Sequence, residues 1–148
     1  MERGGSLKLS EAQVREMSPL NLAYVGDAVW ELHVRSELAA GGGACVRVNA
    51  LHSAAEEMVN AEAQSRIVHL LENFLSREER DLVRRGRNVK PGHAFRGPDP
   101  IDYRYATGFE ALLGYMYLSG KTERLRQIMD EAMVLAQRKD GVEEPANG

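Results

Sequence analysis

Two apolar segments, PLNLAYVGDAVW at residues 19–30 and YATGFEALLGYMYL at residues 105–118, decide how this chain folds. Both have the composition of buried helices, and each contains one charged residue, Asp27 in the first and Glu110 in the second. A carboxylate removed from water costs several kcal/mol unless a cation or good hydrogen bonds meet it. Two such acids, far apart in the sequence, suggest one shared cation, and Mg²⁺ prefers oxygen ligands of this kind.

Small residues accompany both acids. Gly26 precedes Asp27, whereas Ala111 and Gly114 follow Glu110 within about one helical turn. Because small side chains let two helices cross closely, this pattern predicts that the two carboxylates come within reach of one ion. The alternative is that each acid only accepts hydrogen bonds from a buried helix end or an arginine.

The remaining pattern predicts an all-α fold, in which apolar residues recur at helical spacing between capping signals. Predicted helices cover residues 11–17, 20–40, 48–59, 61–74, 77–87, 100–117 and 122–138. Predicted N-terminal signals are Ser10, Ser18-Pro19, Asn60, the Ser76/Glu79 capping box and Asp99-Pro100. Expected inward-facing residues include Leu22, Val25, Val29, Leu32, Leu38, Ala63, Ile67, Leu70, Leu71 and Phe74. We expect one domain over residues 1–138, with its core at about 18–138, and a disordered tail at 139–148.

Bulk properties narrow the class of protein. A chain of 148 residues with net charge −3 suits one globular domain, and no apolar run is long enough to cross a membrane. The single cysteine, Cys45, excludes an internal disulfide and fits the cytoplasm. The four histidines lack the spacing of a zinc helix, and no phosphate-binding loop or nucleophile motif is present. These features favour metal-assisted hydrolysis over catalysis by a serine or cysteine nucleophile.

A basic segment follows the fifth predicted helix. Residues 84–98, RRGRNVKPGHAFRGP, hold five Lys or Arg residues and no acid. Such a segment is suited to a polyanion backbone. The candidate RNA-binding residues are Arg84, Arg85, Arg87, Asn88, Lys90, Arg96 and Arg104. The alternative for the first three arginines is that they stabilise a helix C-terminus through its dipole.

Glu31 lies one turn after Asp27, and Arg35 lies one turn after Glu31. Two interpretations stay open for Glu31. It either supports the metal site as a neighbouring carboxylate or forms an i,i+4 ion pair with Arg35.

Three ordered motifs resemble Mini-ribonuclease III, the short bacterial ribonuclease III-like family that lacks a double-stranded-RNA-binding domain. They are LAYVGDAVWELHVR at 22–35, RRGRNVK at 84–90 and YRYATGFEALLGYMYL at 103–118. The resemblance implies an all-α, homodimeric ribonuclease III-like endonuclease domain that cleaves double-stranded RNA with Mg²⁺. It places the catalytic, metal-binding carboxylates on Asp27 and Glu110. The longer ribonuclease III enzymes carry two further acids, where this chain has Ala23 and Thr107. Thr107 is accordingly a candidate for a supporting role.

The resemblance also implies maturation of 23S ribosomal RNA in the cytoplasm, with products that carry 5′-phosphate and 3′-hydroxyl ends. A large-subunit ribosomal protein is a candidate partner that presents the precursor RNA. The segment at residues 22–35 is the candidate dimer face. Two other interpretations stay open: a non-catalytic RNA-binding or ribosome-associated protein on the same fold, and an unrelated helical interaction protein whose acids are structural.

Overall fold

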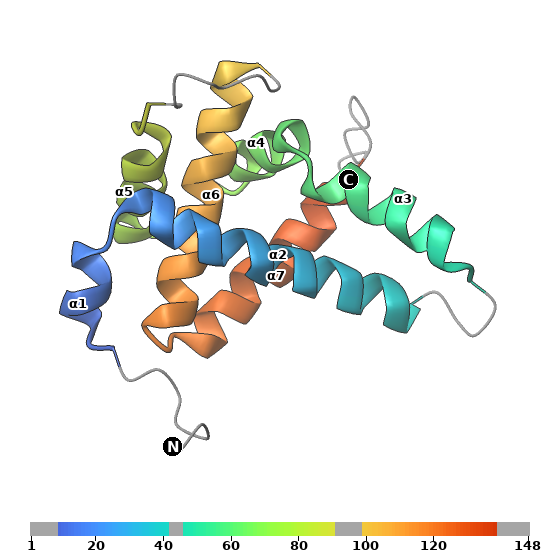
Figure 1. Ribbon diagram of the computed structural model, residues 1–148, viewed down its shortest axis with the longest axis horizontal. Helices are drawn as coiled ribbons and strands as arrows, with labels where there is room; N and C mark the ends of the chain where they lie inside the picture. Colours follow the sequence, from blue (N-terminus) through green and yellow to red (C-terminus); the bar gives the residue numbers. More distant parts are fainter. Residues whose placement is uncertain (1–8, 42–45, 91–98, 139–148) are drawn as a thin grey trace, which may run out of the picture.

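The computed structural model describes residues 9–41, 46–90 and 99–138, and these residues form seven α-helices without a strand (Figure 1). The prediction of an all-α fold is therefore confirmed. The helices are α1 (Glu11–Glu16), α2 (Pro19–Gly41), α3 (Val48–Val59), α4 (Ala61–Leu70), α5 (Arg77–Arg87), α6 (Pro100–Leu118) and α7 (Thr122–Ala136). Cys45, His93, Arg96 and the tail at 139–148 lie outside the described residues.

Local capping signals start the helices where the sequence predicts them. Ser10 and Ser76 each form a capping box, with Gln13 and Glu79 respectively. The side chain of Asn60 accepts the backbone N–H of Ala63 at the start of α4. Such side-chain acceptors satisfy backbone donors that the first turn of a helix leaves open.

Helices α2 and α6 form the centre of the molecule. In Figure 1, α2 crosses in front of α6, α4 and α5 lie beside α6, and α7 passes behind α2. At the centre the Trp30 indole packs edge-on against Phe109, with 5.3 Å between ring centroids. Its N–H donates to the carbonyl of Met58 at 3.2 Å, which fastens α3 to this core. An aromatic pair of this kind adds about 1 kcal/mol beyond area burial.

The predicted inward faces were wrong at three positions. Leu32 is 68% exposed, Leu70 is 51% exposed and Phe74 is 39% exposed. On α2 the buried face instead runs through Leu22, Ala23, Gly26, Trp30 and Val34. Periodicity failed at Leu32 because α2 has apolar residues on two faces, and only one of them packs against α6. The predicted helix 61–74 ends at Leu70, so Phe74 lies beyond α4, where helical spacing does not apply.

No helix in the described part of the chain combines the length and hydropathy needed to span a bilayer.

Candidate active site

Backbone contact between α2 and α6 positions the two acids that the sequence singles out. A Cβ on Gly26 would lie 1.7 Å from the carbonyl oxygen of Glu110, and a Cβ on Gly114 would lie 1.9 Å from that of Leu22. Neither position tolerates a side chain without separation of the helices. The predicted close crossing is confirmed, and Asp27 and Glu110 stand directly beside its contact point.

The Asp27 and Glu110 side chains meet through a hydrogen bond. Asp27 is exposed and Glu110 is half-buried, so the expectation that both are removed from water holds only in part. Burial, together with the hydrogen bond and negative charge of Asp27, raises the pKa of Glu110 to about 9. Without a cation, the pair therefore holds one proton at neutral pH, because two close carboxylates do not both ionise.

Gln64 on α4 is a third member of this site that the sequence analysis missed. The residue is 2% exposed, and its amide N–H donates to the carbonyl of Val59 at 2.7 Å. A hydrogen bond from Gln64 also reaches Glu110, where it favours the ionised carboxylate and lowers the pKa. The buried amide oxygen of Gln64 has no hydrogen-bond partner among the described residues. A glutamine has no motif of its own, so only its approach to Glu110 reveals it.

Glu31 and Thr107, the other supporting candidates, make described polar contacts within their own helices. Glu31 pairs with Arg35, as in the i,i+4 alternative. The buried hydroxyl of Thr107 donates to the carbonyl of Tyr103 at 3.0 Å. Neither contact reaches the Asp27–Glu110 pair.

A second glycine crossing joins α5 to α6. A Cβ on Gly86 would lie 2.7 Å from the Cα of Gly108, and a Cβ on Gly108 would lie 2.5 Å from the carbonyl oxygen of Val83. This contact sets the basic end of α5 against the N-terminal half of α6, the helix that also carries Glu110.

The candidate RNA-binding residues divide into two groups. Arg84 pairs with Asp81 at 2.8 Å, and Arg85 donates to the carbonyl of Arg15 at 3.3 Å. Arg87 lies over the Tyr105 ring and donates to the Asn88 side chain. Lys90 and Arg104 are exposed, and no polar contact is described for either. Arg96 lies outside the described residues.

A surface pocket of about 150 Å³ adds neighbours that the sequence analysis did not select. His69 and Arg80 line it together with Arg84, Arg87 and Tyr105. The His69 and Tyr105 rings pack with 4.1 Å between their centroids. Cations beside surface-accessible aromatic rings, here the exposed His69 and the partly buried Tyr105, are suited to phosphate and base contacts of a nucleic acid.

Comparisons with known proteins agree with this geometry. Residues 20–121 match the family described as Ribonuclease III domain. The chain is 46% identical to Mini-ribonuclease 3 of Thermoanaerobacter sp. (strain X514), over 82% of this chain and 84% of that protein. It is 47% identical to Mini-ribonuclease 3 of Symbiobacterium thermophilum, over 82% of this chain and 92% of that protein. A crystal structure of a Fusobacterium nucleatum protein aligns with TM-score 0.70 and 31% identity, over 82% of this chain and 95% of the other.

Proposed function

This chain belongs to the Mini-ribonuclease III group of the ribonuclease III family and is an endoribonuclease, and we propose that it cleaves double-stranded RNA with Mg²⁺ held by Asp27 and Glu110. The observation that carries the metal assignment is the Asp27–Glu110 pair at the glycine crossing. Membership in an enzyme family favours catalysis over the non-catalytic alternative. It also argues against an unrelated interaction protein.

The residues present fit a divalent cation. Two carboxylates that share a proton release it when a cation takes its place. Gln64, which hydrogen-bonds to Glu110, also carries a buried amide oxygen with no hydrogen-bond partner among the described residues, and this open acceptor is compatible with a hydrated cation in the site. Bound Mg²⁺ would supply Lewis-acid polarisation of the scissile phosphate and acidify a water.

The chain's own residues then have separable tasks. Asp27, which is exposed, offers its carboxylate at the surface where RNA would bind, whereas the half-buried Glu110 on α6 holds the cation from the inner side. The Gln64 amide orients Glu110 and keeps its ionised form accessible. Hydrolysis that breaks the bond between phosphorus and the 3′ oxygen leaves 5′-phosphate and 3′-hydroxyl ends.

Duplex RNA offers phosphates and 2′-hydroxyls rather than readable base edges. Lys90 and Arg104 are exposed cations, the first just after α5 and the second in the first part of α6, and they suit phosphate contacts. Arg87, which lies over the Tyr105 ring of α6, is a third candidate cation. Arg84 and Arg85 have partners in the protein, so we assign them a smaller share of RNA binding.

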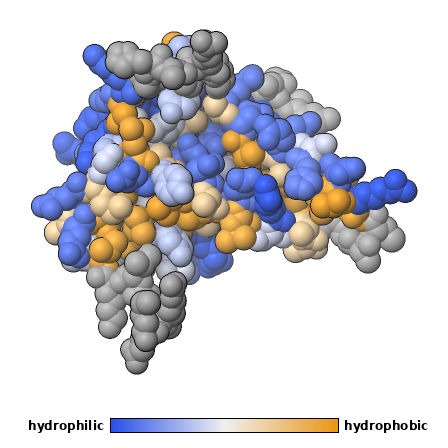
Figure 2. All heavy atoms as spheres, viewed as in Figure 1, coloured by the Kyte–Doolittle hydropathy of each residue, from blue (hydrophilic) through white to orange (hydrophobic). Residues whose placement is uncertain are grey.

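The second apolar face of α2 supports the proposed homodimer. Leu20 is 47% exposed, Tyr24 is 83% exposed and Leu32 is 68% exposed, and they flank Asp27 along one helix. Apolar surface interrupts the hydrophilic surface on the face that α2 crosses (Figure 2). A two-fold contact there would bury this stripe against itself and bring two Asp27–Glu110 pairs to one duplex, one for each strand.

The natural substrate that we propose is precursor 23S ribosomal RNA in the cytoplasm, presented by a large-subunit ribosomal protein. The support is the kinship with Mini-ribonuclease 3 proteins. The test is to incubate the full chain with precursor 23S RNA and Mg²⁺, with and without large-subunit proteins, and to map the ends. Cleavage at one duplex site, with ligatable 5′-phosphate ends, is the expected result. Cleavage of unrelated duplexes alone would reject this substrate but keep the nuclease, whereas Mg²⁺-independent cleavage would reject the metal assignment.

A further inference from the structure

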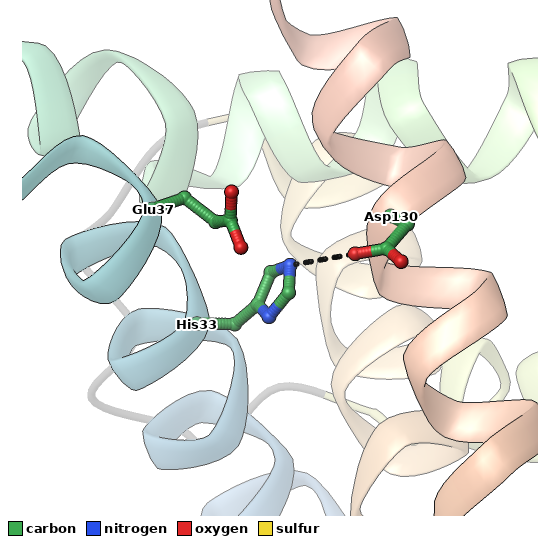
Figure 3. Close-up of side chains that lie close together, drawn as sticks. All are labelled: His33, Glu37 and Asp130. Carbon is green, nitrogen blue, oxygen red and sulfur yellow. Dashed lines mark ion pairs between the residues drawn. The ribbon is translucent and has the colours of Figure 1, made fainter. Parts of the chain in front are cut away.

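Three side chains of the types that ligate metals meet between α2 and α7. His33 and Glu37 lie one turn apart on α2, and Asp130 faces them from α7 (Figure 3). One ligand atom from each residue lies within 4.8 Å of the other two. Nε2 of His33 approaches Oδ1 of Asp130 at 3.6 Å. Spacing along the sequence did not reveal this cluster, because its third member is 93 residues beyond Glu37.

The ring nitrogen of His33 provides an independent indication of a ligand. Its Nε2 is buried and has no hydrogen-bond partner within the described residues, although a buried polar atom normally has one. Figure 3 shows this nitrogen pointing toward Asp130, with the Glu37 carboxylate on the same side. The ring also stacks on Trp30, with centroids 6.1 Å apart and planes at 22°, which fixes its orientation.

The nearest cation, Arg126, contacts Asp130 without occupying the oxygen that faces His33. Arg126 approaches Oδ2 of Asp130 at 3.8 Å and hydrogen-bonds to Glu123 at 2.6 Å. It therefore engages the oxygen of Asp130 that does not face His33. The side chain of Asp130 is 53% exposed, so a cation can enter from solvent.

We propose that His33, Glu37 and Asp130 form a second cation site, selective for Zn²⁺ over Mg²⁺, that fastens the C-terminal half of α2 to α7. Zn²⁺ accepts imidazole nitrogen and carboxylate oxygen in tetrahedral sites, and three such protein ligands leave a fourth position for water. With metal–ligand bonds of about 2.1 Å, ligand atoms in a tetrahedron lie roughly 3.4 Å apart. The 3.6 Å separation of His33 and Asp130 is close to this value. Glu37 is exposed, so a change of rotamer completes the set.

This site is separate from the proposed nuclease centre. His33 follows Asp27 by six positions, which places it about 9 Å further along α2 and turns it roughly 240° around the axis. The imidazole selects transition metals, whereas the Asp27–Glu110 pair offers oxygen ligands that suit Mg²⁺. The inference does not depend on the RNA substrate or on the nuclease assignment.

The experiment measures Zn²⁺ binding to the full chain in a background that removes other ligands. Cys45→Ser removes the single thiol, and Asp27→Asn disables the carboxylate pair. Competition with a chromophoric chelator is then measured for this background, for Glu37→Gln and Asp130→Asn, and for Glu62→Gln, an exposed acid on α4, as the matched control. Both tested side chains are replaced by near-isosteric amides on the surface, so circular dichroism should show unchanged helix content.

We expect one Zn²⁺ per chain, and a loss of affinity of roughly tenfold or more in Glu37→Gln and in Asp130→Asn. Glu62→Gln should bind like the background, and excess Mg²⁺ should not displace Zn²⁺. Co²⁺ bound in place of Zn²⁺ should give visible absorption typical of tetrahedral coordination, and His33→Gln should abolish it. Equal Zn²⁺ affinity in all variants, or no binding by the folded background, would overturn the site and leave an ordinary His33–Asp130 ion pair.

Discussion

The two glycine crossings on α6 differ in closeness and in what they position. At the α2–α6 crossing, added Cβ atoms would approach backbone oxygens to 1.7 and 1.9 Å. At the α5–α6 crossing the corresponding approaches are 2.7 and 2.5 Å. The tighter crossing positions two carboxylates, whereas the looser one sets arginines beside α6.

This difference matches the needs of the two ligands. A Mg²⁺ site requires oxygen atoms placed to a few tenths of an ångström, because the ion demands near-octahedral geometry. Phosphate contacts tolerate larger displacements, since long cationic side chains adjust to a flexible polyanion. The fold therefore uses backbone contact where precision matters most.

The largest difference between the two crossings should appear when one of their glycines is replaced by alanine. We expect Gly26→Ala to lower the free energy of unfolding by about 3 kcal/mol, since α2 must move away from α6. Cleavage should fall by about 10²-fold or more, because such a shift displaces the carboxylates. Gly86→Ala should cost roughly half as much stability and reduce cleavage less.

Thermal melts and initial cleavage rates measure both effects. Gly41→Ala is the matched control on α2, since an added Cβ there would meet nothing within 4 Å. Equal losses of activity in Gly26→Ala and Gly86→Ala would remove the distinction between the crossings.

Without a cation, Glu110→Gln should be more stable than the wild type, and the difference should grow as the pH rises. The pKa of Glu110 in the folded state, about 9, lies above its ordinary value of 4.5, so the folded protein binds the proton more tightly. The free energy of unfolding therefore falls between about pH 5 and pH 9 in the wild type, and this loss is absent from the variant. In chelator at pH 8 we expect the melting temperature of Glu110→Gln to exceed that of the wild type by roughly 5 °C.

Melting curves from pH 5 to pH 9 test this expectation, with Glu62→Gln as the control for loss of a surface charge. Adding Mg²⁺ should raise the wild-type melting temperature and leave Glu110→Gln unchanged. A pH-independent difference between the two proteins would contradict the shared proton.

Gln64→Leu should weaken cleavage by about 10- to 100-fold, because Glu110 loses the amide that orients its carboxylate. Part of the activity should return at higher Mg²⁺ concentration, a rescue that general destabilisation would not produce. Measured Mg²⁺ dependence of the initial rate checks this, and an unchanged half-saturating concentration would argue for a purely structural role.

The smallest effects should come from substitutions of the exposed cations Lys90 and Arg104. Lys90→Gln and Arg104→Gln should each weaken RNA binding and reduce the slope of log K against log salt by about 1, the contribution of one phosphate contact. Arg126→Gln on α7 is the control and should keep the wild-type slope. Filter-binding measurements with Asp27→Asn, over a range of KCl concentrations, test this without cleavage. A slope unchanged by both substitutions would show that Lys90 and Arg104 do not contact RNA phosphates.

The sequence predicts the local features of this fold well. The helix at Val48–Val59 and the Ser76/Glu79 capping box agree with the structure, because caps and apolar spacing act within a few residues. The close approach of Asp27 to Glu110 was also predictable, since glycines mark both helices.

Tertiary features were less accessible. Leu32 was assigned inward but is exposed, because α2 is apolar on two faces and periodicity does not decide which one packs on α6. Gln64 and the His33–Asp130 contact were missed, since each depends on a helix distant in sequence. Their chemistry emerges only when α4 and α7 are placed against the central crossing.

The most direct test of the Asp27–Glu110 assignment is cleavage of a long duplex RNA by the wild type, Asp27→Asn and Glu110→Gln, with Mg²⁺ or with chelator. We predict Mg²⁺-dependent cleavage by the wild type, and a loss of about 10³-fold or more in both variants, which should still bind the duplex. Wild-type rates in either folded variant, or cleavage that persists in chelator, would contradict a metal centre at the α2–α6 crossing.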